Sequence, residues 1–210
     1  MWDDKNAMQE FEEIAKNDFE IIIETGTWKG DGTLYFTQFR DLVYTIEVDP
    51  HYYVEASQKF MANGYKLTNR QKFKDMELRT FQKDKKIIHS LFAHSPEGLR
   101  SFLNQLKDKK ILFFLDAHWD KAQCQAINFF PVNEELKVLA EFKQKNCYIV
   151  IHDIKHPEKD FGYDSINTGL EEIHLTLDYI KPFLDKINKD FKLEFNKESE
   201  TKRGILYVKP

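Results

Sequence analysis

The sequence predicts an α/β protein built around a doubly wound, mostly parallel sheet of about seven strands. Short apolar runs, typical of buried strands, alternate with longer segments of helical periodicity along the chain. Several of these runs end directly in an acid or a histidine, where open α/β sheets place their ligands. The 210 residues suffice for one such sheet with a full core, so we expect a single domain spanning residues 1–210.

The expected strands are apolar runs bounded by polar residues. The run 111–116 is almost continuously apolar, as a central parallel strand buried on both faces should be. The complete set of expected strands is 19–24, 42–47, 87–92, 111–116, 147–151, 191–195 and 204–208.

Helices are expected between these strands, at 7–17, 33–40, 51–63, 96–106, 132–145 and 168–188. Pro96 suits the first turn of its helix, and Gly64 suits the end of the helix before it. The helix within residues 1–18 is expected to cap the sheet. Residues 66–86 carry many basic side chains, a pattern that favours a solvated helix face over a clamp for an anionic substrate.

Composition and charge restrict the class of protein. The 31 basic and 35 acidic residues leave a net charge of −4, which argues against nucleic acid as the main partner. Cys124 and Cys147 lack the spacing of a disulfide framework and indicate free thiols in a reducing compartment. No apolar run is long enough to span a bilayer, and the first residues do not resemble a signal peptide. We therefore expect a soluble, cytoplasmic protein, whose apolar N-terminal helix could support a homodimer.

Residues 19–33 form the most informative segment, in which an apolar strand leads into an acid, a glycine-bearing loop and then a helix. In open α/β sheets this arrangement builds a nucleoside site beside a helix N-terminus. The spacing of Gly26 and Gly30 matches neither the dinucleotide fingerprint nor a P-loop, which disfavours a nicotinamide dehydrogenase. The pattern that remains is acid-x-Gly-x-x-x-Gly, beginning at Glu24. An ordinary tight turn between strand and helix is the alternative interpretation.

A second acid supports the nucleoside site. Glu47 ends the strand 42–47 and follows Glu24 by about the twenty-residue interval at which an acid meets a ribose. Its carboxylate can accept hydrogen bonds from two vicinal hydroxyls. The alternative is a strand-end acid that faces water.

Acids and histidines also follow the later strands. Asp116 ends the strand 111–116, while His152 and Asp153 end its expected neighbour, so that the three could hold one Mg²⁺ or Mn²⁺ ion. Such an ion could lower the pKa of a substrate hydroxyl. His118, two residues beyond Asp116, could be the general base. Alternatively, Asp116 caps a helix or bonds a cofactor amine, His152 is a satisfied core residue, and His118 lies in a surface loop.

Together these motifs resemble those of small class I S-adenosylmethionine (SAM)-dependent methyltransferases. The likeness is carried by residues 24–27 with 32–33, 44–50, 115–119, 149–153 and 203–208. It implies a Rossmann-like sheet that ends in an antiparallel hairpin, SAM as cofactor and O-methylation as the reaction. The cofactor-binding residues that it implies are Glu24, Gly26, Thr27, Gly30, Thr33, Glu47, Val48, His94 and Ser95. The chain departs from the family at Trp28, where many members carry glycine, and at His94, where many carry an acid.

A metal-dependent branch of this family methylates macrolide and aminocoumarin sugars. Carried over by position, the resemblance implies Asp116, His152 and Asp153 as metal ligands, with His118 and Asp116 as catalytic residues. The branch usually has two adjacent acids where this chain has His152 and Asp153, which bears on the identity of the metal. We therefore expect methyl transfer to a hydroxyl of a sugar or glycan, as in glycan modification. The alternatives are a metal-free methyltransferase for another small molecule (a phenol, carboxylate or phosphonate) and a non-catalytic nucleoside-binding protein.

Overall fold

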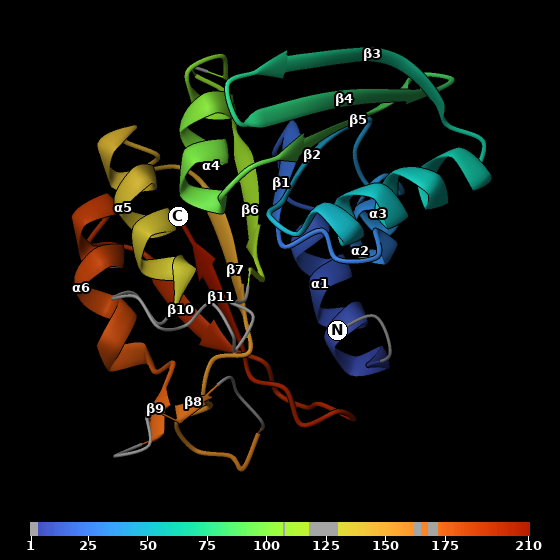
Figure 1. The fold of residues 1–210 in the computed structure, drawn as a ribbon. Coiled ribbons are helices and arrows are strands. Elements are labelled where there is room, and N and C mark those ends of the chain that lie inside the picture. Colours follow the sequence, from blue (N-terminus) through green and yellow to red (C-terminus); the bar gives the residue numbers. More distant parts are fainter. Residues whose placement is uncertain (1–3, 107, 118–129, 162–164, 168–171) are drawn as a thin grey trace. The chain divides into compact units, whose positions relative to one another are not determined.

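The structure is a computed structural model that describes residues 4–106, 108–117, 130–161, 165–167 and 172–210 (Figure 1). Contacts divide the chain into two compact units. One unit comprises residues 18–117, and the other comprises residues 1–17 together with 118–210. The fold class is the expected one, because strands and helices alternate along both units.

The unit of residues 18–117 is built on six described strands in the order β6-β1-β2-β5-β4-β3. Its strands are β1 (Ile21–Thr25), β2 (Leu42–Glu47), β3 (Lys66–Phe73), β4 (Met76–Lys83), β5 (Lys86–Phe92) and β6 (Ile111–Leu115). Its helices are α2 (Asp31–Phe36), α3 (Pro50–Ala62) and α4 (Ser95–Leu103). Strands β6, β1, β2 and β5 are parallel, whereas β4 and β3 are antiparallel to their neighbours.

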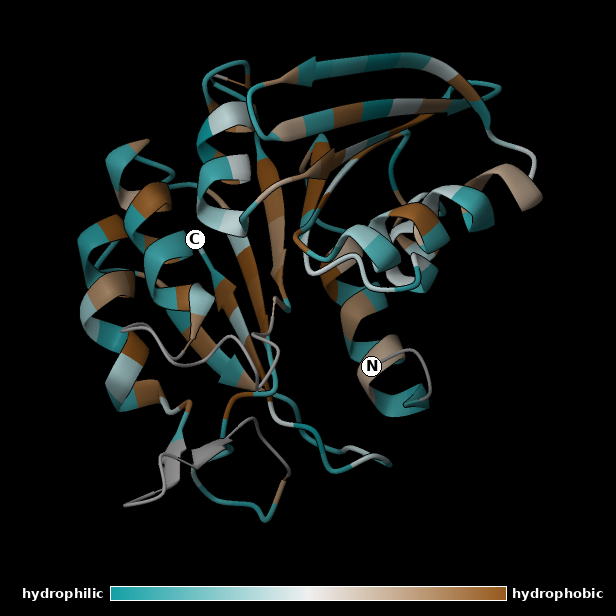
Figure 2. Ribbon diagram, in the orientation of Figure 1, coloured by the Kyte–Doolittle hydropathy of each residue, from teal (hydrophilic) through white to brown (hydrophobic). Residues whose placement is uncertain are grey.

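Two layers of helix cover this sheet. Phe60 of α3 packs in one buried cluster with Phe81 and Ile88, whereas Gly98 of α4 lies against Ile46. Because side chains alternate between the faces of a strand and Ile88 pairs with Val43, α3 and α4 cover opposite faces. All five residues of β1 and of β6 are buried, and β6 takes the hydrophobic colour in Figure 2. This burial on both faces is what the continuous apolar sequence of β6 predicts.

The helical interpretation of residues 66–86 is wrong. These residues form the antiparallel hairpin of β3 and β4, which joins β5 through a second hairpin turn. Each turn has only two residues between its strands, and the first of them, Lys74 and Asp84, has a positive φ of 54°. Hairpin turns of this kind usually carry glycine, asparagine or aspartate there, followed by glycine. Lys74 is none of these and no glycine follows Asp84, so only the charge was apparent.

The other unit contains β7 (Tyr148–His152), β10 (Lys192–Phe195) and β11 (Ile205–Lys209), in the order β10-β11-β7. β11 is antiparallel to both neighbours, so the expected C-terminal hairpin is confirmed. The unit also contains α1 (Lys5–Ala15), α5 (Pro131–Glu141) and α6 (Leu177–Ile187), and a two-stranded sheet of β8 (Ser165–Asn167) and β9 (Glu172–His174). None of the described helices is long and apolar enough to cross a membrane.

Side-chain caps fix the first residues of two helices in this unit, α6 and α1. The helix expected at 168–188 begins only at Leu177, because β9 occupies residues 172–174 and the Thr176 hydroxyl caps the helix through the Tyr179 N–H. At the other end, buried Asp4 caps α1 through the Ala7 N–H. The same Asp4 carboxylate accepts hydrogen bonds from Ser199 and Thr201, which attaches α1 to the loop between β10 and β11.

Candidate cofactor site

The loop after β1 has a backbone shape that requires glycine. Gly26 and Gly30 have φ values of 81° and 82°, in the left-handed region that favours glycine. A Cβ at Gly26 would lie 2.5 Å from the carbonyl oxygen of Asp116, so the loop passes directly over the end of β6. The Gly26 N–H donates to the carbonyl of Ile46 at 3.0 Å, which holds the loop across the ends of β1 and β2. The two glycines of the motif thus position the loop at the carboxyl ends of three strands.

Glu24 holds this loop in place through hydrogen bonds with Thr33 and Thr45. Its carboxylate is buried and accepts hydrogen bonds from the hydroxyls of Thr33, at 2.5 Å, and Thr45, at 2.7 Å. The Thr45 hydroxyl lies 2.5 Å from that of Thr27, so β1, β2, the loop and α2 meet at one polar centre. Burial raises the pKa of Glu24 to about 8, with a further contribution from the negative charge of Asp116. Glu24 is therefore placed to hold the loop in shape, and it is largely neutral at pH 7.

Glu47 lies at the carboxyl end of β2 with its carboxylate directed at backbone N–H groups. Oε2 accepts from the N–H of Trp28 at 2.7 Å, and Oε1 accepts from Val48 and Asp49 at 2.9 Å each. Burial raises the pKa of Glu47, against the lowering effect of these hydrogen bonds. A carboxylate oxygen has two lone pairs, so Oε2 keeps acceptor capacity for a hydroxyl. Trp28 has a positive φ of 47°, and it contributes to the site by donating its backbone N–H to Glu47.

His94 and Ser95 follow β5 beside Glu47. The Ala93 N–H, just before them, donates to the Glu47 carbonyl at 2.9 Å. His94 is the N-cap residue of α4, and Ser95 is buried in its first turn. Burial lowers the pKa of His94, so its imidazole is neutral at pH 7. The expected cofactor residues of the sequence thus gather along the carboxyl ends of β1, β2 and β5.

The predicted metal ligands belong to different units. Asp116 follows β6 in the unit of residues 18–117, and its N–H donates to the carbonyl of Thr25 at 3.2 Å. His152 ends β7 in the other unit, and Asp153 follows it with a φ of 61°. Both side chains are buried, and Nδ1 of His152 lies 3.3 Å from Oδ1 of Asp153. The predicted base His118 lies outside the described residues.

Asp153 also pairs with a cation of its own unit. The guanidinium of Arg203 donates to Oδ1 of Asp153 at 2.9 Å. Carboxylate and imidazole groups are the donor types that Mn²⁺ accepts. A metal ion bound through Asp153 would share that carboxylate with a guanidinium, which the sequence pattern did not indicate.

Comparison with solved structures shows which known fold this chain has. No protein-family model matches the sequence, and no curated protein matches it. Solved structures do match over nearly the whole chain. A protein of Streptococcus mutans assigned as a methyltransferase, in complex with S-adenosylhomocysteine (SAH), superposes with a TM-score of 0.54 at 10% identity, covering 98% of this chain and 97% of the other. The chain has the class I methyltransferase fold.

Two further solved structures are also similar to this chain. DesVI of Streptomyces venezuelae superposes with a TM-score of 0.53 at 12% identity, with 98% of this chain and 92% of the other covered. An rRNA methylase of Streptococcus thermophilus gives 0.52 at 9% identity, with 98% and 96% covered. At these identities the likeness establishes the fold alone.

Two features of the site were not found from the sequence. Thr45, which supplies one of the two hydroxyls on Glu24, lies opposite Glu24 in the register of β1 and β2. End-to-end parallel pairing of the expected strands 19–24 and 42–47 would instead have placed Glu24 opposite Glu47, so the register had to come from the structure. The N–H of Trp28 on Glu47 depends on the conformation of the loop, for which the sequence carries no signal beyond its glycines.

Proposed function

We propose that this protein is a SAM-dependent O-methyltransferase that acts on a hydroxyl of a sugar or glycan. The observation that carries the proposal is the position of Glu47. Its buried carboxylate stands at the carboxyl end of β2, against the backbone of the glycine loop, where an open α/β sheet binds a ribose. The likeness of the fold to a structure that holds SAH supports SAM as the nucleoside.

Each expected cofactor residue has a role in this proposal. Glu47 accepts hydrogen bonds from the two ribose hydroxyls, and Gly26 and Gly30 let the loop lie against the methionine part of the cofactor. Glu24 acts through Thr33 and Thr45, which keep the loop in shape. The remaining members of the set are Thr27 in the loop and Val48, His94 and Ser95 around the adenine.

Methyl transfer mainly requires that the acceptor oxygen be aligned with the methyl group and the sulfur. This is catalysis by positioning. His118 is proposed as the base that takes the proton of the acceptor hydroxyl. Asp116, His152 and Asp153 are proposed to hold a divalent ion. When bound, such an ion lowers the pKa of a coordinated hydroxyl.

A second candidate is methyl transfer without a metal, to a non-sugar acceptor. The ion pair of Asp153 with Arg203 favours it, because the guanidinium already neutralises that carboxylate. Dependence of turnover on Mn²⁺ or Mg²⁺ after treatment with a chelator separates the two candidates. Retention of full activity on a phenol or carboxylate in the presence of chelator would support the second.

The test of the cofactor site is calorimetric titration with SAH. Wild type is expected to bind SAH, and Glu47→Ala is expected to lower the affinity at least about tenfold, as loss of charge-assisted hydrogen bonds implies. The matched control is Glu55→Ala, which removes an acid from the exposed side of α3. Absence of SAH binding to the wild type would reject the proposed function, as would an equal loss of affinity in both variants.

A further inference from the structure

The β3–β4 hairpin concentrates positive charge in an acidic protein. Residues 66–86 contain eight basic and three acidic side chains, a net charge of +5. The whole chain carries −4, so the other residues together carry −9. Strand β3 is exposed along nearly its full length at the edge of the sheet, and it takes mostly the hydrophilic colour in Figure 2. A strand of this kind attracts anions, in contrast to the rest of the molecule.

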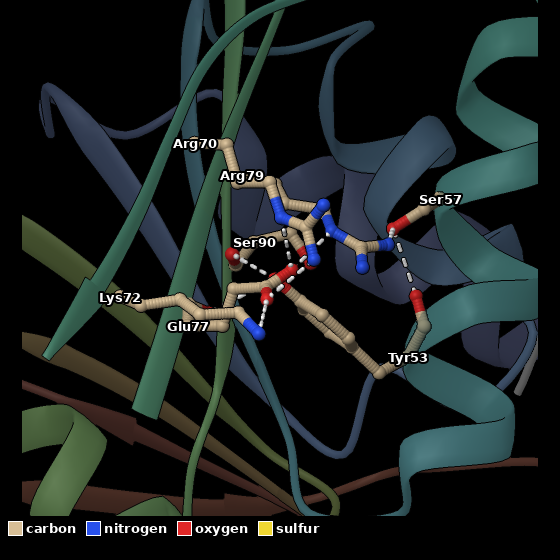
Figure 3. A network of polar contacts seen from close by, with 7 residues as sticks. All are labelled: Tyr53, Ser57, Arg70, Lys72, Glu77, Arg79 and Ser90. Carbon is tan, nitrogen blue, oxygen red and sulfur yellow. Dashed lines mark hydrogen bonds and ion pairs between the residues drawn. The ribbon is translucent and has the colours of Figure 1, made fainter. Parts of the chain in front are cut away.

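Three cations of the hairpin surround one carboxylate (Figure 3). The guanidinium of Arg70 donates to both oxygens of Glu77, at 3.0 and 2.9 Å, and that of Arg79 donates to Oε1 at 2.7 Å. The ammonium of Lys72 lies 3.5 Å from Oε2. Hydrogen bonds from Arg70 and Arg79 lower the pKa of Glu77 to about 2. The cluster therefore keeps a net charge of +2 at neutral pH.

Arg79 and Glu77 attach the cluster to helix α3. Arg79 donates to the hydroxyl of Ser57 at 3.0 Å, and its guanidinium lies 4.5 Å from the centre of the Tyr53 ring. The Tyr53 hydroxyl in turn donates to the carbonyl of Glu77 at 2.9 Å. Figure 3 shows these side chains converging from α3 and the hairpin. An array held in this way loses little conformational entropy when an anion binds.

Two of the three cations face solvent, whereas Arg79 is 16% exposed. The side chains of Arg70 and Lys72 are 54% and 70% exposed, whereas that of Glu77 is 10% exposed. An anion that approaches β3 therefore meets the two cations before the carboxylate. Lysine on an edge strand also discourages pairing with another strand. That role alone does not require a second arginine bound to α3.

The cluster lies on the same rung of the sheet as the proposed ribose ligand. Glu47 pairs with Phe92 in β5, Phe92 pairs with Glu77 in β4, and Glu77 pairs with Lys72 in β3. Three strand spacings separate Glu47 from Lys72, a distance of about 14 Å. The cations and the cofactor loop thus share the edge formed by the carboxyl ends of β2 and β5. A substrate of several sugar units can reach both.

We infer that Arg70, Lys72 and Arg79 bind an acidic group of an anionic oligosaccharide acceptor, such as a carboxylate on a sugar. This inference rests on the proposed function and narrows its substrate class. The remaining charge of −9 repels a long polyanion, and no aromatic side chain of the hairpin is among the exposed ones that could stack on bases, so the surface disfavours RNA. Two copies of β3 side by side would bring like charges together, which disfavours a second copy of the chain.

The test compares two double variants that remove the same charge. Arg70→Ala/Lys72→Ala changes the cluster, whereas Lys66→Ala/Lys85→Ala changes the opposite end of the hairpin. The probes are a galacturonate hexamer, a neutral glucose hexamer and a single-stranded RNA, titrated at low ionic strength. The cluster variant is expected to bind the galacturonate hexamer about tenfold more weakly than wild type, and the control variant within about twofold. The neutral hexamer is expected to bind all three proteins equally and more weakly.

Several results would overturn the inference. These are equal losses in the two double variants, tighter binding of the RNA than of the acidic hexamer, or no binding of the hexamer by wild type. Thermal unfolding and SAH titration accompany each variant, and Lys72→Glu, a single exposed change, replaces the double variant should it fail to fold. If wild type binds SAH but not the hexamer, this inference alone is rejected. If wild type does not bind SAH, the proposed function is rejected.

Discussion

Glu24 and Thr45 lie opposite each other in the neighbouring parallel strands β1 and β2, and the Thr45 hydroxyl donates to the Glu24 carboxylate at 2.7 Å. The same carboxylate accepts from Thr33 at the start of α2. A buried acid thus joins two strands and the helix that follows the glycine loop. The shape of the loop depends on this centre, although none of its groups needs to touch the cofactor.

Thr45→Val tests the centre, because valine keeps the shape of threonine and removes its hydroxyl. The variant is expected to lose about 1–3 kcal/mol of stability, since buried Glu24 loses one of its two donors. The control is Thr68→Val on the exposed strand β3, whose hydroxyl donates at 3.2 Å to the carbonyl of Thr80 in β4. Urea unfolding measures both variants. Equal stability of the two would show that Glu24 does not depend on Thr45.

The raised pKa of Glu24 predicts a pH dependence of stability. Its pKa is about 8 in the folded protein against an ordinary value of 4.5, so the folded state binds more protons between these values. Stability from this group is therefore complete below pH 4.5 and is lost as the pH rises toward 8, by at most about 1.4 kcal/mol per pH unit. Glu24→Gln keeps a neutral acceptor and is expected to flatten this decline. Unfolding at intervals from pH 5 to 8.5 measures the difference, and parallel curves for the two proteins would contradict it.

Gly26→Ala tests the close passage of the loop over β6. The added Cβ meets the carbonyl oxygen of Asp116 at 2.5 Å, and the φ of 81° is strained for alanine. Gly64→Ala is a matched control, since Gly64 has a φ of 87° but its Cβ would meet only the flexible Lys83 side chain at 3.6 Å. We expect Gly26→Ala to cost about 2 kcal/mol more than the control and to abolish SAH binding. Differential scanning fluorimetry with and without SAH measures both effects. SAH binding by Gly26→Ala at wild-type affinity would refute the role of the loop.

The positions of the strands and of their terminal acids could be predicted because they depend on local patterns. The apolar run that forms β6 is buried on both faces, and Asp116 follows it at the expected edge. Glu24 and Glu47 likewise end the strands that the sequence indicates. A continuous apolar run fixes a buried strand almost regardless of its neighbours.

The remaining features depend on pairing between segments. β3 carries few apolar residues, and it is a strand because β4 supplies its hydrogen bonds. The interpretation of its charges as a solvated helix face therefore failed at the level of secondary structure. Arg203, about fifty residues from Asp153, contacts it because β11 pairs with β7. No local pattern in the sequence indicates either relationship.

The ion pair of Arg203 with Asp153 decides how a metal could bind. Asp153 has a side chain that is 6% exposed, so Arg203→Ala leaves a buried carboxylate and is expected to cost about 1–3 kcal/mol. If Asp153 is a metal ligand, the same change removes a competing cation, and Mn²⁺ is expected to bind more tightly and to restore stability in proportion to its affinity. Lys197→Ala, an exposed cation in the loop between β10 and β11, is the control and is expected to change neither quantity. Calorimetric titration with Mn²⁺ and thermal unfolding in its presence measure the two effects. If Arg203→Ala is destabilised but binds Mn²⁺ no better than wild type, Asp153 serves to fix the loop after β7 and is not a metal ligand.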